Sequence, residues 1–388
     1  MYLDYQSAKP VDPEVIAAMN PYMIEKYGNA SSLHEVGDWS TEALDISRLI
    51  IANFVNAREP EEIIFTSGAT EANNLAIIGY ALRNRQKGNH LIISEVEHIS
   101  IHNIAKYLRK NGFEVSIVPV DYTGTVRLDK LEERIRPDTI LISIQHASNE
   151  IGTIQPIKSI GKIARERKIV FHVDAVASEG QIPIDVQRDV IDMLTLSSND
   201  IYGPRGVGAI YVRKGILLNP LIIGGGQERG LRSGTEDVAA IVGFAKAAEL
   251  ALKYLPEESK RLQQLRDKAI KKVLETIPRS YLNGHTTNRL PNNAHFRFDF
   301  IEGESILLSF KELGIAVSTG SACSSKTLEP SHTLISLGLL HEEAHGSLEI
   351  TMGRLTTEAD IDKFLEALPG IVKRLRDMSP LTKNKVGM

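Results

Sequence analysis

The most reactive type of side chain occurs once in this chain, as Cys323 in the segment Ser318–Lys326. A lone thiol is usually an inert core residue, because free cysteine is among the most buried residue types. Here glycine and serine surround the thiol and Lys311 and Lys326 add positive charge, which favours an accessible, ionised thiolate. A single cysteine excludes an internal disulfide and any four-cysteine metal site. Sulfur or metal chemistry would therefore use Cys323, alone or with a partner.

Polar side chains also gather where strand-like runs of the sequence end. Ligands of open α/β sheets bind at the carboxyl ends of the strands, and a helix N-terminus at such an end can hold a phosphate. Any one such segment is weak support, since Ser67 or Thr70 would also serve as an ordinary helix N-cap. Together they predict one polar crevice. The five segments are Thr66–Glu71, Ser94–His98, His146–Gly152, Phe171–Ala175 and Ser197–Gly206.

Two further motifs match the sequence patterns of known sites but lack the sequence context that those sites need. His341–His345 fits the HExxH pattern of zinc proteases, which needs both histidines on one face of a continuing helix. Gly346 and a strand-like run follow at once, so we interpret the match as coincidence. The glycine-rich residues 224–235 have backbone N–H groups suited to an anion. They lack a following Walker lysine, so we do not expect a nucleoside triphosphate.

Strand-like and helix-like segments, which must position these residues, alternate along the first part of the chain. This alternation predicts a mostly parallel sheet buried on both faces by helices. Strands are expected at Glu62–Thr66, His90–Ser94, Val115–Pro119, Thr139–Ile144, Ile169–Val173, Met193–Leu196 and Gly206–Val212. Helices are expected at Thr70–Arg85, Ile99–Lys110, Leu128–Ile135 and Ile157–Lys168.

The pattern changes after about residue 255. A buried helix, Val238–Leu252, and then a charged helix, Glu257–Thr276, precede short strands and helices. We expect a large α/β domain over residues 15–256 and a smaller α+β domain made of residues 1–14 and 257–388. Its further elements are Ala294–Phe298, Glu302–Leu313, Leu348–Met352 and Thr357–Leu375, and the tail Thr382–Met388 is expected to lack regular structure.

Composition narrows the class of protein. The 388 residues are 42% hydrophobic and 24% charged, with a formal net charge of -4. These are values of an ordinary globular protein, without a basic footprint for nucleic acid. We find no apolar run of membrane-spanning length and no signal-peptide pattern at the N-terminus. We therefore expect a cytoplasmic protein that binds neither nucleic acid nor membrane.

With these motifs the chain resembles the cysteine desulfurases of the class V aminotransferase group. The family consists of fold-type I homodimers that depend on pyridoxal phosphate (PLP) and supply iron–sulfur cluster assembly. The resemblance implies a mostly parallel central sheet with helices on both faces, plus a smaller α+β domain. It runs nearly end to end, through Leu3–Tyr5, Gly28–His34, Ser67–Asn74, Glu97–His98, Asn149–Gly152, His172–Ala175, Tyr202–Pro204, Arg232–Thr235 and Gly320–Cys323.

The resemblance implies a phosphate site for PLP. Ala69 and Thr70 would hold the phosphate at a helix N-terminus, together with Ser197 and the partner subunit's Thr235. Asn199, close to Ser197 in the chain, is counted with the same cofactor-binding residues. These assignments agree with the N–H groups expected at the first polar strand end.

The resemblance also implies how the cofactor ring and the thiol are used. His98 would stack on the pyridine ring and Asn149 would contact its hydroxyl. Asp174 would pair with the ring nitrogen and keep it protonated, so that the ring acts as an electron sink. Cys323 would attack the sulfur of bound cysteine and carry a persulfide.

Four positions depart from the family pattern. The lysine that forms the Schiff base is missing, and Asp200 occupies its position; a carboxylate cannot form an imine. Ala177 replaces a glutamine, and Glu349 replaces the arginine that would bind the substrate carboxylate, which it would repel. Lys9 stands where the family usually has threonine. It would neutralise Asp200 or Glu349, or replace the missing amine, or simply be an exposed lysine in a turn.

We therefore predict a homodimer of iron–sulfur cluster assembly with weak or lost intrinsic desulfurase activity. It would dock a scaffold protein through Arg376–Leu381 and present Cys323 as persulfide acceptor or as metal ligand of a shared iron–sulfur cluster. PLP would be bound non-covalently at best. The alternative is a competent PLP-dependent desulfurase that converts L-cysteine to L-alanine and transfers sulfur through Cys323. A different aminotransferase-type activity would leave that thiol unexplained.

Overall fold

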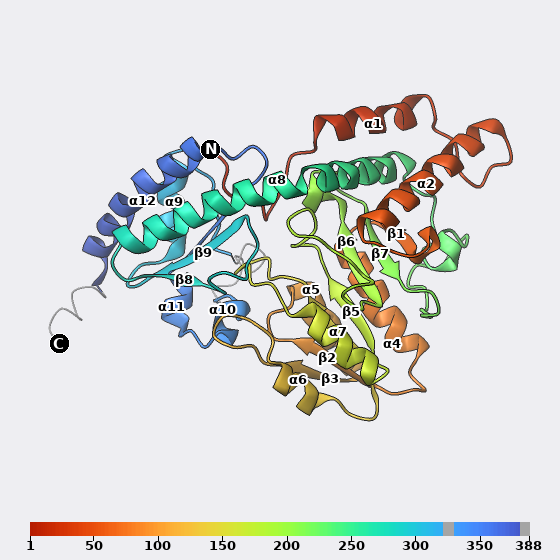
Figure 1. The fold of residues 1–388 in the computed structure, drawn as a ribbon, viewed down its shortest axis with the longest axis horizontal. Coiled ribbons are helices and arrows are strands. Elements are labelled where there is room, and N and C mark those ends of the chain that lie inside the picture. The colour runs from red at the N-terminus through yellow and green to blue at the C-terminus, as the bar shows by residue number, and fades with distance from the viewer. Residues whose placement is uncertain (321–329, 381–388) are drawn as a thin grey trace.

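The computed structural model describes residues 1–320 and 330–380. Cys323 and the predicted tail Thr382–Met388 lie outside these residues. The chain forms two sheets of unequal size, with one long helix running along both (Figure 1). None of the described helices is both long enough and apolar enough to cross a membrane.

The larger sheet has seven strands in the order β1-β7-β6-β5-β4-β2-β3. The pairs β2–β3, β2–β4, β4–β5 and β5–β6 are parallel, whereas β7 runs antiparallel to β6 and β1. The expectation of a mostly parallel sheet is confirmed. The strands are β1 (Ile63–Thr66), β2 (His90–Ser94), β3 (Glu114–Val118), β4 (Thr139–Gln145), β5 (Val170–Asp174), β6 (Met193–Ser197) and β7 (Gly208–Val212).

Alternate strand residues enter two different cores, one on each face of this sheet. In β1, Ile63 and Phe65 join the core with α2, α7 and the first part of α8, while Ile64 joins the core with α3, α4 and α5. Side chains on successive strand residues point to opposite faces, so apolar runs without alternation are what a doubly covered sheet requires. The helices are α1 (Pro13–Ile24), α2 (Glu35–Phe54), α3 (Ala69–Asn74), α4 (Tyr80–Arg83), α5 (Ile99–Lys110), α6 (Leu128–Arg134), α7 (Ile157–Glu166) and α8 (Val238–Thr276).

The smaller sheet is antiparallel, in the order β10-β9-β8. A third hydrophobic core of the protein packs against this sheet and contains Leu3. Asp4 forms an isolated β-bridge with Thr351 of β10, so the N-terminal residues do pack with this sheet. The strands and helices are β8 (Ser280–Asn283), β9 (Asn293–Phe298), β10 (Ser347–Thr351), α9 (Gly303–Glu312), α10 (His332–Ser336), α11 (His341–His345) and α12 (Glu358–Met378). The HExxH sequence forms only the short α11, with β10 beginning just after it.

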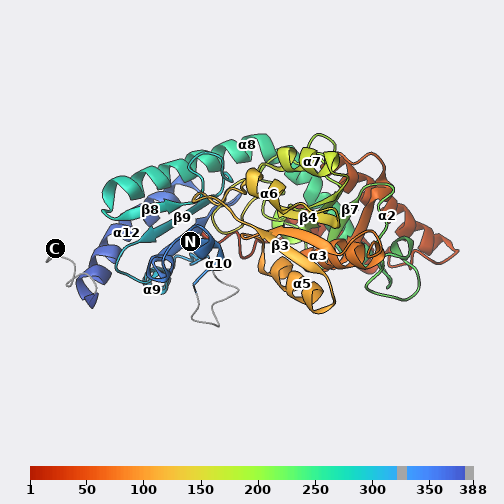
Figure 2. The same cartoon turned by 90° about the horizontal axis from the view of Figure 1, so that it is seen from below.

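Helix α8 joins what the sequence predicted as two helices. It continues through Pro256 for 39 residues, although a proline inside a helix removes one hydrogen bond and costs about 3 kcal/mol. Packing at both ends offsets this cost: Ala248 lies in a core of the large sheet and Leu262 in the core of the small sheet. The two parts are thus connected by a continuous helix (Figures 1 and 2).

Candidate active site

A cavity of about 520 Å³ lies between the carboxyl ends of the large sheet's strands and the smaller sheet. All five predicted polar segments contribute residues to its lining, including Thr70, His98, Asn149, Asp174 and Ser197. The small domain adds Ser318, Gly320 and Glu349, and the N-terminal segment adds Gln6 and Ser7. The prediction of one polar crevice is therefore confirmed for the described residues.

Asp174 ends β5 and lies at the base of this cavity. Its Oδ2 accepts a hydrogen bond from Asn73 Nδ2 at 2.8 Å, and its Oδ1 accepts one from the backbone N–H of Val176 at 3.1 Å. These donors hold a carboxylate that is only 7% exposed, where an unpaired charge would be costly. Asn73 is the residue that sequence reasoning missed. Its position on α3, four residues after Ala69, was the available signal.

The first turn of α3 forms the opposite end of the cavity. Gly68 has φ 144° and no side chain caps the helix, so the N–H groups at Ala69 and Thr70 face the cavity side without a side-chain acceptor. A Cβ built on Gly68 meets no atom within 4 Å, which leaves room for a group bound there. Ser197, at the end of β6, donates to Asn199 Oδ1 at 2.9 Å.

The cavity wall carries acidic groups: Glu71, Asp174, Asp200 and Glu349 line it, and its described lining includes neither lysine nor arginine. Burial raises the pKa of Asp200, an effect that the positive charge of Lys9 partly offsets. Asn199 Nδ2 donates to Asp200 Oδ2 at 2.9 Å.

Glu349 is a buried acidic residue of the cavity wall, 3% exposed. Burial, followed by the neighbouring Glu150 carboxyl, raises the pKa of Glu349 well above its usual value. Asn293 Nδ2 donates to its Oε1 at 2.9 Å. The raised pKa weakens the expected repulsion of a substrate carboxylate, and the Glu349 side chain supplies no attracting positive charge.

Lys9 is not an exposed turn residue, and that alternative is wrong. It is 8% exposed, its amine donates to the backbone oxygen of Asp200, and it lies 5.7 Å from the centroid of the Tyr202 ring. It is absent from the residues that line the cavity. Lys9 thus supports the turn behind Asp200 instead of presenting its amine to the cavity.

Two histidines of the predicted segments belong to the interior instead of the cavity lining. His172 Nδ1 lies 2.8 Å from Ser143 Oγ and its Nε2 lies 3.0 Å from Thr195 Oγ1. Burial lowers the pKa of His172 to about 3 and that of His146 to about 4, so both are neutral. They hold strands and loops together beneath the site.

Among the predicted site residues that the structure describes, Thr235 is not brought to this cavity. It lines a separate hollow beside Tyr22 and Lys26, so its predicted role in the partner subunit's site stays a prediction. Cys323 lies outside the described residues. Its flanking positions Gly320 and Ser318 do line the cavity.

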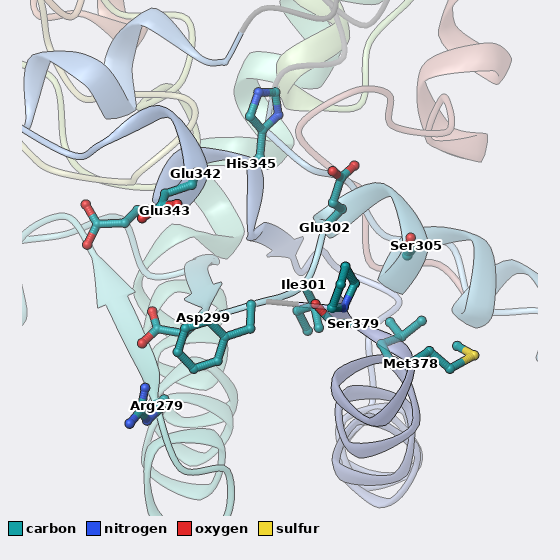
Figure 3. A pocket seen from close by; sticks show the side chains of 13 residues that line it. Arg279, Asp299, Ile301, Glu302, Ser305, Glu342, Glu343, His345, Met378 and Ser379 are labelled. Atoms are coloured by element: carbon teal, nitrogen blue, oxygen red, sulfur yellow. The ribbon is translucent and has the colours of Figure 1, made fainter. Parts of the chain in front are cut away.

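A larger cavity, of about 730 Å³, lies at the end of α12 in the small domain (Figure 3). Met378 and Ser379 line one side of it, and Asp299, Glu302 and Glu343 give it an acidic rim. It is remote from the polar strand ends, so its size does not make it the reaction site.

Known proteins share both the sequence and this fold. A match to the aminotransferase class-V family extends over residues 1–364. The chain belongs to this family. It is 59% identical to cysteine desulfurase IscS 1 of Archaeoglobus fulgidus over 98% of this chain and 99% of that protein. It is 50% identical to cysteine desulfurase IscS of Methanosarcina thermophila over 98% and 94%. A solved NifS-like protein superposes with a TM-score of 0.90 at 35% identity, over 97% of this chain and 100% of that chain.

Membership in the class V cysteine desulfurases confirms the fold-type I architecture and implies PLP as the cofactor. The cavity fits the phosphate and ring of PLP, because it combines an open, uncapped helix N-terminus with a buried, hydrogen-bonded Asp174. It does not offer an amine for a covalent link, since its described lining contains no lysine.

Proposed function

We propose that the protein is a PLP-dependent cysteine desulfurase of iron–sulfur cluster assembly, which converts L-cysteine to L-alanine and transfers the sulfur through Cys323. The observation that carries this proposal is the meeting of Thr70, His98 and Asp174 in one cavity. The names of relatives that match this chain from end to end support a competent enzyme.

Each residue has a distinct task in this proposal. The N–H groups at Ala69 and Thr70 and the hydroxyl of Ser197 bind the phosphate. His98 covers the ring, with its Nδ1 held 2.8 Å from Ser100 Oγ, and Asn149 contacts the ring hydroxyl. Asp174 keeps a proton on the ring nitrogen. PLP, when bound, supplies an electron sink.

The acidic wall favours a second candidate function, in which intrinsic desulfurase activity is weak or lost. Asp200 and Glu349 provide neither an amine nor a positive charge in the cavity. The protein would then bind PLP non-covalently or not at all, and present Cys323 as persulfide acceptor or as ligand of an iron–sulfur cluster. As persulfide acceptor, the Cys323 thiolate would take the outer sulfur of another protein's persulfide, whose thiolate leaves; as cluster ligand, it would bind a cluster whose sulfide comes from another source.

In both cases we propose a cytoplasmic homodimer that docks a scaffold protein at the end of α12. The support is the larger cavity, where Met378 is 64% exposed at the last helical position. The acidic rim formed by Glu302 and Glu343 suits a partner with basic side chains. The partner subunit's Thr235 would complete each phosphate site.

Alanine formation from L-cysteine separates the two candidates. The purified protein is incubated with excess PLP and dithiothreitol, and alanine and sulfide are quantified, with Cys323→Ala as the control. Multiple turnovers that Cys323→Ala abolishes support the competent enzyme. Less than one alanine per subunit would overturn the competent enzyme. The second candidate is then supported if Cys323 takes up sulfur from added sulfide in the presence of an oxidant.

A further inference from the structure

Glu71 of α3 fixes the turn between β1 and that helix. Its Oε2 accepts a hydrogen bond from the backbone N–H of Ser67 at 2.7 Å, and its Oε1 accepts one from Arg232 Nε at 3.1 Å. This carboxylate therefore occupies the N–H group of Ser67 and is itself held by Arg232. The N–H groups at Ala69 and Thr70, where the phosphate is proposed to bind, are left to a group in the cavity.

Glu71 also lines the cavity, which brings its negative charge close to that of a bound phosphate. A phosphate monoester carries about 1.5 to 2 negative charges at pH 7, and like charges at short range repel. The described lining of the cavity contains neither lysine nor arginine, so Arg232 balances Glu71 from behind the cavity wall. Only 23% of the Arg232 side chain and 16% of the Glu71 side chain are exposed. Salt therefore screens this ion pair weakly.

The loop that carries Arg232 is anchored to β1, the edge strand that leads into the same turn. Glu228 Oε2 accepts a hydrogen bond from the backbone N–H of Phe65 at 2.7 Å, and Glu228 Oε1 forms an ion pair with Arg48 Nη2 at 2.6 Å. An isolated β-bridge between Ile222 and Arg232 closes the loop. The loop is therefore fixed at two points, to the strand before the turn through Glu228 and to the helix after it through Arg232.

We propose that Arg232 is a positioning residue for the phosphate of the cofactor. It neutralises Glu71 and keeps that carboxylate on the N–H group of Ser67, so that the turn before α3 accepts a dianionic group. Arg232 does not itself line the cavity, so it acts through Glu71. The inference deepens the proposed function and rests on it in one respect, that the group bound at this turn is the phosphate of PLP.

The two partners of this ion pair should have opposite effects on phosphate binding. Loss of Arg232 leaves an unpaired carboxylate beside the phosphate, whereas loss of the Glu71 charge leaves an unpaired cation close to it. A pair that only stabilised the fold would weaken binding whichever partner was changed.

The test is the dissociation constant, Kd, of pyridoxine 5′-phosphate for the full chain freed of PLP, measured by equilibrium dialysis and ligand fluorescence. This compound carries the phosphate of PLP but no aldehyde, so it forms no imine with surface lysines. We expect Arg232→Met to raise Kd about tenfold. Glu71→Gln keeps an acceptor for the N–H group of Ser67 and should bind at least as tightly as the parent protein. Arg232→Met combined with Glu71→Gln should return to within about threefold of the parent, because neither charge is left unpaired.

Arg213→Met is the matched control. Arg213 Nε lies 3.0 Å from Asp192 Oδ1, and 18% and 11% of these two side chains are exposed. Asp192 directly precedes β6, at the opposite end of that strand from Ser197. The loss of Arg213 should therefore lower the melting temperature and leave Kd unchanged.

Three results would overturn the inference: a parent protein that does not bind the compound, an unchanged Kd in Arg232→Met, or a Kd raised as much in Glu71→Gln or Arg213→Met as in Arg232→Met. Binding requires no turnover, so it is independent of alanine formation. A protein that forms alanine without this pattern of Kd values keeps the proposed function and loses the inference. A protein that shows the pattern but forms no alanine does the reverse.

Discussion

Asp200 lines the cavity with a carboxyl group at the position where the family resemblance expects an amine. The amine of this region belongs to Lys9, which is buried behind Asp200 and donates to its backbone oxygen. The positive charge is therefore kept close to the site but removed from the cavity wall. A sequence can identify such an exchange of residue types, but only coordinates show that Lys9 points away from the cavity lining.

At this scale we predict that Asp200→Lys allows a covalent link to PLP that the unchanged chain cannot form. After borohydride reduction, peptide mass analysis should find pyridoxyl-lysine at position 200 in the variant and none in the parent protein. Adding Glu349→Arg should raise kcat/KM for L-cysteine roughly tenfold or more, because a charged hydrogen bond contributes about 1.5–3 kcal/mol.

Two results would contradict this account. A label on Lys9 in the parent protein would show that its amine can leave Asp200 and reach the cofactor. Equal kcat/KM values in the single and double variants would show that Glu349 does not occupy the place of a substrate-binding cation. Glu349→Gln, which keeps the size of the side chain and adds no positive charge, is the control and should change little.

At the scale of elements, the loop after β2 makes the stability of the folded protein depend on pH, through the buried carboxyl group of Glu97. Glu97 is fully buried, and burial raises its pKa to about 8, although Ser94 and the backbone N–H of Gln145 hydrogen-bond to it. In the unfolded chain this group ionises near pH 4.5. The folded protein holds the extra proton between these values, so the contribution of Glu97 to stability decreases as pH rises from about 4.5 to 8.

We predict that Glu97→Gln flattens this decline by up to about 1.4 kcal/mol per pH unit. The measurement is the free energy of unfolding in urea at pH 5.5, 6.5 and 7.5, compared between variant and parent. Buried neutral histidines such as His172 add an opposite slope below about pH 6.5, but this slope is common to both proteins and cancels in the difference. Parallel curves would mean that Glu97 is ionised in the folded state.

The positions of helices and strands could be predicted where a single hydrophobic periodicity dominated the local sequence. The strands β2 and β4 and the helix α5 match their predicted ranges within about a residue, because continuous apolar runs and helical spacing are local signals. The strand β8, exposed at Tyr281, has no such run. The continuity of α8 through Pro256 depends on two cores at once, which no local window contains.

The sequence predicted which strand ends contribute residues to the candidate site, but it did not predict the contacts between those residues. Which strands lie side by side decides that His98 and Asp174 share a cavity, and that order is seen only in the assembled sheet. The hydrogen bond of Asn73 to Asp174 and the raised pKa of Glu349 depend on burial. Burial of a polar group is a property of the assembled fold and not of its own segment.

At the scale of the whole molecule, the proposed reaction site and the proposed docking site lie in different places. The smaller cavity is lined by residues of both sheets, whereas the larger one lies at the end of α12 (Figure 3). Docking and sulfur handling should therefore be separable by mutation. Cys323 connects them only if its segment extends toward a partner.

We predict that deleting residues 379–388 abolishes binding of an iron–sulfur scaffold protein from the same organism while the thiol stays reactive. The deletion removes Ser379 and Pro380 from the larger cavity but leaves α12 and the core residue Val372 in place. Binding is measured by co-elution on size-exclusion chromatography, and thiol reactivity by iodoacetamide.

Cys323→Ala should give the reverse result, with the scaffold bound and no alkylation. In that complex an iron–sulfur cluster should be lost faster, because a soft thiolate ligand is missing. Retained binding after the deletion, or an equally long-lived cluster with Cys323→Ala, would show that the docking site or the ligand lies elsewhere.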